Sequence, residues 1–309
     1  MAEISNPYLI TDKNIRQPPS GWLQKLKFLG PGFILSASIV GSGELIATTV
    51  LGAKAGFAAL WIIIASCLVK VALQLEFGRH AILTGETSMQ LFNKLPGLKF
   101  GQGHWTVWTI AFMLLLKVVQ IGGIVGGASV VLHMLFPVVN IKVWASVNAL
   151  MAAGMIYNGR YGLVERGSLI MIAIFTVFTV ISLLSVQYTP FHFTWADVLN
   201  GFRFSLSKEE IGIAIGAFGI TGVASDEIMA YNYWCIEKGY ASYTGPYSDS
   251  AEWKQRAQGW IKVMYVDALV AMIIYTGVTV TFYLLGAAIL YGNENIPNGN
   301  EVIETLALI

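Results

Sequence analysis

The chain has 309 residues and a formal net charge of +1; 55% of its residues are hydrophobic and 12% are charged. Soluble domains carry about 25% charged residues, so this composition excludes an ordinary water-soluble fold and predicts an all-α polytopic membrane protein. The near-neutral charge offers no basic surface for nucleic acid, so the lipid bilayer is the expected partner.

The chain is mostly polar from Met1 to Ser20 and lacks a leading apolar core there, so we expect no cleavable signal peptide. A membrane core of about 30 Å needs about 20 apolar helical residues. We predict seven such spans in chain order, at about Phe28–Leu51, Phe57–His80, Trp105–Phe136, Val143–Tyr157, Ser168–Tyr188, Ile211–Ile236 and Trp260–Tyr291.

The distribution of basic residues predicts the orientation of these spans. With the N-terminus in the cytoplasm, thirteen basic residues lie on the inner side: Lys13, Arg16, Lys25, Lys27, Arg79, Lys94, Lys99, Arg160, Arg166, Lys238, Lys254, Arg256 and Lys262. Four lie outside: Lys54, Lys142, Arg203 and Lys208. This asymmetry satisfies the positive-inside rule, so we expect a protein of the cell (inner) membrane with a cytoplasmic N-terminus.

Two spans carry glycine and acidic residues together near their middle. The first span contains Gly41, Ser42, Gly43 and Glu44, and the sixth contains Gly219, Thr221, Gly222, Ala224, Ser225, Asp226 and Glu227. Buried charge and glycine both disfavour a continuous membrane helix, and broken helices in corresponding positions of two halves indicate a transporter site. We predict non-helical backbone at about Gly41–Glu44 and Gly219–Ser225, facing each other across a midplane cavity.

The two broken spans are five helices apart, which is the spacing of two inverted five-helix repeats. We therefore predict a cytoplasmic segment at 1–27, a first repeat at 28–188 and the start of a second repeat at 207–309. An eighth helix would begin after Asn300, so we expect the sequence to be a truncated part of a longer protein that has three more helices in this repeat.

The first two spans resemble a known family. The run Gly30-Pro31-Gly32-Phe33-Ile34, the break, Gly52-Ala53, Gly56-Phe57, Leu60-Trp61, Leu73-Gln74, Arg79 and Thr84-Gly85 resemble the Nramp divalent-metal transporters without a gap over about 55 residues. This resemblance implies the fold of two inverted repeats of five helices, with extra C-terminal helices, and a secondary-active transporter rather than an enzyme.

The chain departs from the family at its metal ligands. The family has Asp-Pro-Gly-Asn where this chain has Gly41-Ser42-Gly43-Glu44, and Met-Pro-His at about Val223-Ala224-Ser225-Asp226. The family's acidic pair for proton movement corresponds to positions near Gln120 and Gly123 of this chain, and Lys117 lies one turn away. Loss of the sulfur and imidazole ligands makes manganese or iron transport improbable, since oxygen ligands favour hard ions.

Three cargo hypotheses remain open. Gly-Ser-Gly at a helix break also resembles amino-acid/polyamine transporters, where its N–H groups hold a carboxylate, so a zwitterion such as an amino acid is preferred. Asp226 or Glu227 would then receive its amine. The alternatives are a hard cation such as Mg²⁺, bound by Glu44 and Asp226, and a non-transporting relic.

Structural roles compete with these hypotheses. Gly41–Gly43 could pack helices closely, Glu44 could pair with Lys70 or Lys117, and Asp226 and Glu227 could cap a half-helix. Lys70, Lys117 and Gln120 form either a coupling network or an interior polar contact. We expect no cofactor and a monomer.

Overall fold

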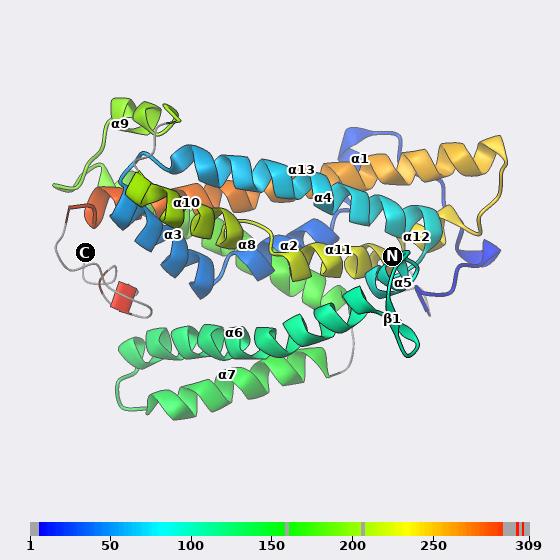
Figure 1. The fold of residues 1–309 in the computed structure, drawn as a ribbon, viewed down its shortest axis with the longest axis horizontal. Helices are drawn as coiled ribbons and strands as arrows, with labels where there is room; N and C mark the ends of the chain where they lie inside the picture. Colours follow the sequence, from blue (N-terminus) through cyan, green and yellow to red (C-terminus); the bar gives the residue numbers. More distant parts are fainter. Residues whose placement is uncertain (1–5, 158–160, 205–207, 293–300, 303–304, 306–309) are drawn as a thin grey trace. The chain divides into compact units, whose positions relative to one another are not determined.

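A computed structural model describes residues 6–157, 161–204, 208–292, 301–302 and 305. Helices dominate the described chain, and a short antiparallel hairpin pairs Lys99 with His104 (Figure 1). The elements are η1 (Asp12–Asn14), α1 (Trp22–Leu26), α2 (Pro31–Ile39), α3 (Ser42–Ala55), α4 (Leu60–Thr84), α5 (Ser88–Asn93), β1 (Lys99–Phe100), β2 (Gly103–His104), α6 (Trp105–Leu135), α7 (Ile141–Ile156), α8 (Tyr161–Val186), α9 (Trp195–Asn200), α10 (Lys208–Ile220), α11 (Ser225–Lys238), α12 (Tyr240–Thr244) and α13 (Ala251–Ile289).

Every predicted span corresponds to a helix or to a pair of helices. By length and apolar composition, four described helices can cross a membrane, and the bent pair α2–α3 would make a fifth. Helix α7 is apolar but shorter. Helices α8 and α13 begin earlier than predicted, at Tyr161 and Ala251. Glu165 and Arg166 near the start of α8 and the charged residues at the start of α13 hid these beginnings from a hydropathy pattern. The predicted eighth helix after Asn300 lies almost wholly outside the described residues.

The chain divides into two compact units. Unit 1 comprises Met1–Leu35, Val71–Val119 and Ser225–Met272, and unit 2 comprises Ser36–Lys70, Gln120–Ala224 and Ile273–Ile309. Four of the five unit boundaries fall within α2, α4, α6 and α13, so these helices contribute to both units, and the fifth lies at the start of α11. The predicted repeat boundaries at 28–188 and 207–309 follow another division of the chain and stay a prediction.

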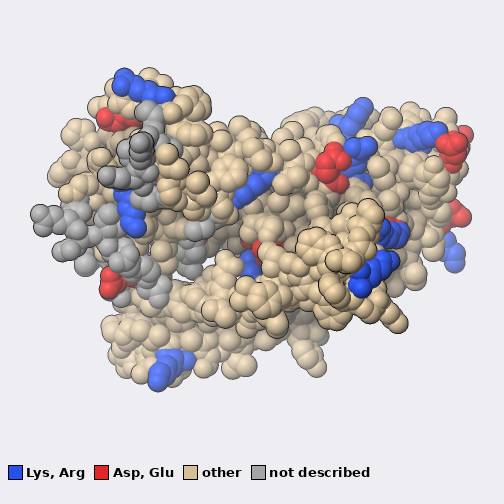
Figure 2. All heavy atoms as spheres, in the orientation of Figure 1, with Lys and Arg blue, Asp and Glu red and all other residues tan. Residues whose placement is uncertain are grey.

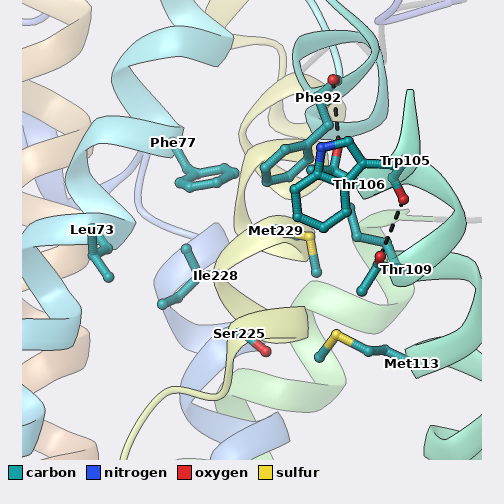
Figure 3. A pocket seen from close by; sticks show the side chains of 11 residues that line it. Leu73, Phe77, Phe92, Trp105, Thr106, Thr109, Met113, Ser225, Ile228 and Met229 are labelled. Carbon is teal, nitrogen blue, oxygen red and sulfur yellow. Dashed lines mark hydrogen bonds between the residues drawn. The ribbon is translucent and has the colours of Figure 1, made fainter. Parts of the chain in front are cut away.

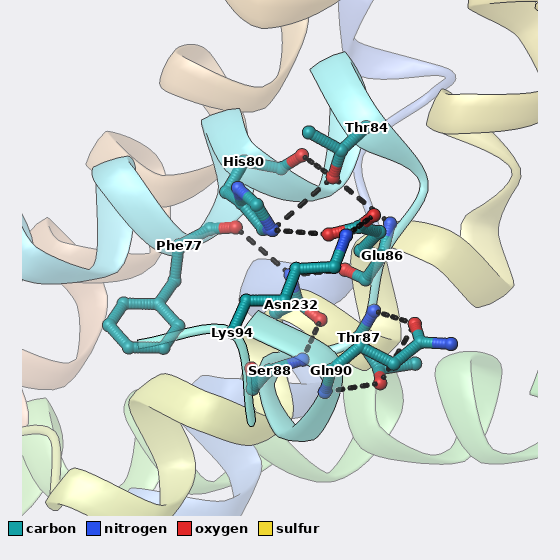
Figure 4. A network of polar contacts seen from close by, with 9 residues as sticks. All are labelled: Phe77, His80, Thr84, Glu86, Thr87, Ser88, Gln90, Lys94 and Asn232. Atoms are coloured by element: carbon teal, nitrogen blue, oxygen red, sulfur yellow. Dashed lines mark hydrogen bonds and ion pairs between the residues drawn. The ribbon is translucent and has the colours of Figure 1, made fainter. Parts of the chain in front are cut away.

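Unit 1 is held together by polar contacts to backbone groups near its helix ends. Asn232 of α11 accepts a hydrogen bond from the backbone N–H of Ser88 at 3.0 Å. Its amide nitrogen donates to the carbonyl oxygens of Phe77 and Glu86 at 3.2 and 3.1 Å (Figure 4). Because an unpaired buried backbone group is costly, the fully buried Asn232 fixes the end of α4 and the start of α5 against α11.

Unit 2 contains helices that approach each other at glycine. A side chain at Gly286 of α13 would collide with the backbone of Thr49 in α3, so only glycine permits this contact. The hydroxyl of Tyr283 donates to the carbonyl of Gly56 and accepts the backbone N–H of Ala59 at 3.0 Å. Small residues at helix contacts are typical of membrane proteins, where close backbone packing holds helices together.

The surface carries few charges. On the face drawn in Figure 2, the Lys, Arg, Asp and Glu side chains are few, and broad uncharged areas lie between them and their small groups. Large apolar side chains such as Leu115, Val119, Leu150, Ile170 and Phe178 are exposed. An outward apolar surface of this extent is unfavourable in water and favourable in lipid, which agrees with an integral membrane protein.

Candidate functional site

The first span breaks between α2 and α3. Gly41 has an extended backbone with φ −135° and ψ −171°, and the two helices meet at an angle of 55°. The predicted break is therefore present but shorter than expected, because Ser42, Gly43 and Glu44 are already helical. Glu44 lies in the first turn of α3, where a negative charge interacts favourably with the helix dipole. The side chain of Ser42 lies outside the described residues.

The sixth span breaks between α10 and α11. Its non-helical residues run from Thr221 to Ala224, so the prediction that Gly219 belongs to the break is wrong. Gly222 has a φ of +71°, a left-handed conformation that L-residues other than glycine rarely adopt. A Cβ atom at Gly222 would lie 2.9 Å from the Sγ atom of Cys67. Backbone conformation and lack of space therefore both require glycine here.

Within unit 2, Glu44 reaches the sixth-span break. Its side chain is buried, with 5% exposure, and its Oε1 atom accepts the hydroxyl of Thr279 at 2.7 Å. The same oxygen accepts the backbone N–H of Gly222 at 3.3 Å. A buried carboxylate needs such donors, since an unpaired charge is strongly disfavoured in a low-dielectric interior. Glu44 therefore joins α3 to the break and to α13.

The other side of the same peptide group meets a positive charge. Lys70 of α4 donates from Nζ to the carbonyl oxygen of Thr221 at 2.6 Å, while the N–H of Gly222 faces Glu44. The Thr221–Gly222 peptide thus has a carboxylate at its N–H and an ammonium at its C=O. The expected pairing of Glu44 with Lys70 takes this form, in which one peptide group lies between the two charges.

Within unit 1, Asp226 forms an ion pair with Lys117. The Nζ atom of Lys117 lies 2.7 Å from Oδ2 of Asp226, with side-chain exposures of 22% and 24%. Asp226 and the buried Glu227 occupy the first turn of α11, where acids are favourable. The zwitterion hypothesis expects a substrate amine beside Asp226. In the structure the ammonium group beside this acid is that of Lys117. Lys117 pairs with this acid rather than with Glu44, and Gln120 is exposed.

Ser225, predicted to bind cargo, lines an apolar cavity of unit 1. The cavity has a volume of about 310 Å³ and lies among α4, α5, α6 and α11. In Figure 3, Ser225 and Met229 of α11 stand opposite Met113 and Thr109 of α6. Its lining is almost wholly apolar and suits hydrocarbon rather than an ion. The neighbouring Ala224 of the break, by contrast, is half-buried in unit 2.

Asp267, a further buried acid of unit 1, was not predicted from the sequence as a site residue. Its Oδ1 atom accepts the N–H of Gly30 at 2.8 Å, and Oδ2 accepts the N–H of Gly32 at 2.6 Å and the hydroxyl of Tyr231 at 3.0 Å. These backbone groups flank Pro31, the first residue of α2. Asp267 therefore caps α2 from another helix. A lone acid inside the predicted seventh span was the available signal for this site.

Comparisons with known proteins agree on one family. A family model described as natural resistance-associated macrophage protein-like (Nramp) matches residues 32–308. The chain is 24% identical over 280 residues to a divalent metal cation transporter, MntH, of Latilactobacillus sakei, covering 89% of this chain and 57% of that protein. A protein of the same name from Caldanaerobacter subterraneus is 23% identical over 292 residues, covering 91% of this chain and 63% of that protein.

A solved structure confirms the fold. A variant of the Eremococcus coleocola manganese transporter matches with a TM-score of 0.69 at 13% identity, covering 97% of this chain and 62% of that one. The predicted all-α transporter fold is therefore correct. The chain spans about three-fifths of the length of these relatives.

Proposed function

Because the chain belongs to the Nramp family, we propose that it forms part of a secondary-active transporter that works by alternating access and carries a hard divalent cation such as Mg²⁺. The relatives are named for divalent metal cations and manganese. Their names favour a cation over the amino acid expected from Gly-Ser-Gly. We further propose a cell-membrane location with the N-terminus in the cytoplasm, which would let an external thiol reagent label Asn200→Cys but not Asn93→Cys.

The observation that carries this proposal is the buried carboxylate of Glu44 next to the sixth-span break. A carboxylate has about four lone-pair sites, so Glu44 can bind a cation or its water while it keeps its contacts to Thr279 and Gly222. Mg²⁺ keeps several waters and takes only one or two carboxylates from a protein. One buried acid with a hydroxyl beside it therefore suits Mg²⁺ better than a metal that requires a complete protein cage.

Softer metals fit the described residues less well. Among these residues, no group of three His, Cys, Asp or Glu side chains could hold a metal ion. The resemblance places the family's Met-Pro-His at about Val223-Ala224-Ser225-Asp226, where this chain has neither a thioether nor an imidazole. Because thioether and imidazole select transition metals, their replacement favours hard ions.

The zwitterion hypothesis has less support from the same contacts. The N–H of Gly222 is bound by Glu44, and Asp226 is bound by Lys117. An amino acid that used the donor at the break and the acid at the start of α11 would have to displace both of these partners. A cation bound to Glu44 would displace neither.

Uptake into liposomes tests the proposal. The whole protein should carry Mg²⁺ saturably into liposomes loaded with a Mg²⁺-sensitive dye, and Mn²⁺ and radiolabelled amino acids should enter far more slowly. Glu44→Gln should abolish uptake, because the amide keeps the oxygen acceptor and loses the charge. Glu76→Gln on α4 is the matched control, since its exposed carboxylate pairs locally with Arg79. The proposal would be refuted if the protein carried an amino acid but not Mg²⁺, or if it carried no solute at all.

A further inference from the structure

The carboxyl end of α10 collects carbonyl oxygens. The last carbonyl groups of a helix have no partner within it and carry the negative end of the helix dipole. Here Phe218 and Gly219 belong to the last turn of α10, and Thr221 follows directly. The left-handed Gly222 then turns the chain away, so the next helix cannot satisfy these oxygens.

Two side chains of α4 meet these carbonyl groups within unit 2. Lys70 donates from Nζ to the oxygen of Thr221 at 2.6 Å and to that of Gly219 at 3.2 Å. Ser66, one turn earlier, donates to the oxygens of Phe218 and Thr221 at 2.9 and 3.2 Å. Nζ also lies 5.8 Å from the ring centroid of Phe218, within the range of a cation–π interaction. The ammonium thus has the carbonyl and aromatic surroundings of a bound cation.

We propose that the end of α10 is an alkali-cation site whose resident cation is the ammonium of Lys70. Backbone carbonyl groups at the ends of broken membrane helices are ligands for Na⁺. With a tethered ammonium in this place, no dissolved Na⁺ is needed to hold the break together, and transport is independent of sodium. The inference concerns the co-ion and does not depend on which cargo is carried.

An oxygen without a partner supports the assignment of a site. The hydroxyl of Thr221 is buried, with the residue 1% exposed, and it has no hydrogen-bond partner within the part of the chain that the structure describes. A buried hydroxyl without a partner costs free energy, and an ion can supply the missing interaction. Thr221 would therefore offer a Na⁺ ion both its carbonyl and its hydroxyl oxygen.

Charge balance gives the site its preference for a cation. Glu44 binds the N–H of the same peptide group whose C=O binds Lys70. If the ammonium is replaced by a neutral group, the buried carboxylate loses its nearby positive charge. A cation at the vacated carbonyl oxygens then restores the balance, since the attraction between charges is strong in a low-dielectric interior.

Thermal unfolding of the purified full chain in detergent tests the proposal, with NaCl compared against choline chloride at equal ionic strength. Wild type and Lys70→Arg should have the same Tm in both salts. Lys70→Gln should have a lower Tm in choline chloride, and Na⁺ should raise it saturably toward the wild-type value. Lys54→Gln is the matched control, because Lys54 is an exposed lysine of the same unit.

Three results would overturn the proposal. A Lys70→Gln protein whose Tm is the same in both salts has no cation site at the end of α10. A Lys70→Gln protein that is unfolded in both salts would also show that no cation site exists there, since bound Na⁺ should replace the ammonium and stabilise the fold. A Tm of the wild type that rises with Na⁺ as much as that of the variant would show that Lys70 does not fill the site.

Discussion

Asp267 in unit 1 and Glu44 in unit 2 are both buried carboxylates inside predicted membrane spans, but their hydrogen-bond partners differ. Asp267 accepts two backbone N–H groups and a phenol, through both of its oxygens. Glu44 accepts the hydroxyl of Thr279 at 2.7 Å and the backbone N–H of Gly222 at 3.3 Å. Both residues are at most 5% exposed.

The difference shows that burial of an acid does not by itself mark a transport site. Asp267 caps the start of α2. A Cβ atom at Gly32 would lie 2.6 Å from the backbone carbonyl oxygen of Asp267, so the two backbone segments are closely packed here. Glu44 contacts a helix break, where the backbone is not held by a helical hydrogen-bond ladder. We therefore infer a structural role for Asp267, and the proposed cargo binding rests on Glu44.

The largest expected effect is on the structural acid. Asp267→Asn places an amide NH₂ group against backbone N–H groups and leaves at least one of them unpaired, which should cost about 3 kcal/mol or more. Little folded protein should remain when detergent-solubilised samples are heated before size-exclusion chromatography. Asp249→Asn is the control, because that carboxylate is 83% exposed and pairs only on the surface with Lys254. Equal stability of the two variants would remove the distinction between Asp267 and other acids.

A smaller effect is expected at the sixth-span break. Gly222→Ala should destabilise the protein by about 1–3 kcal/mol, because it combines a left-handed backbone with a contact to the sulfur of Cys67. Adding Cys67→Ala should recover the steric part and leave the backbone part. Gly212→Ala in α10 is the control, since its Cβ meets nothing within 4 Å and should be neutral or stabilising. Thermal unfolding of the three variants measures both parts, and a full recovery by Cys67→Ala would show that conformation at Gly222 does not matter.

The Lys117–Asp226 pair should contribute less still. Both side chains are about one-quarter exposed, so a double-mutant cycle of Lys117→Met and Asp226→Asn should give a coupling of about 1 kcal/mol. Unfolding free energies of the two single variants and the double variant provide the measurement. A loss of Mg²⁺ binding in Asp226→Asn as large as that in Glu44→Gln would show that Asp226 also binds cargo.

The smallest effect is expected for an exposed carboxylate with similar donors. Asp197 of α9 accepts the backbone N–H and the hydroxyl of Thr194, both at 2.7 Å, and these hydrogen bonds lower its pKa. Because the pKa is lower in the folded state, this contribution is present above the unfolded value of about 4 and is lost as the pH falls through the lower folded value. Asp197→Asn should change Tm slightly at pH 7 and not at pH 3, and equal changes at both would contradict this assignment.

The sequence predicted the helices well because their apolar length is a local property. It also located both breaks, since glycine next to an acid is unusual inside a span. The ends of the breaks were less predictable. Helical backbone at Ser42–Glu44 depends on how α3 begins, and the turn at Gly222 depends on its close contact with Cys67.

The partners of the acids were beyond a single sequence. Asp267 meets Gly32 across 235 positions of the chain, and Glu44 meets Gly222 across 178. Gly30-Pro31-Gly32 was seen to resemble the family. The sequence did not show that the backbone N–H groups of these glycines bind the distant Asp267. The pairing of Lys117 with Asp226 also depends on how α6 packs against α11, which hydropathy does not report.

Isothermal titration of the purified whole protein with Mg²⁺ tests the central assignment most directly. The account predicts saturable binding to wild type and loss of that binding in Glu44→Gln, which should remain folded because the amide oxygen still accepts from Thr279 and Gly222. Mn²⁺ should not bind more tightly than Mg²⁺. Unchanged Mg²⁺ binding in a folded Glu44→Gln protein would contradict the account.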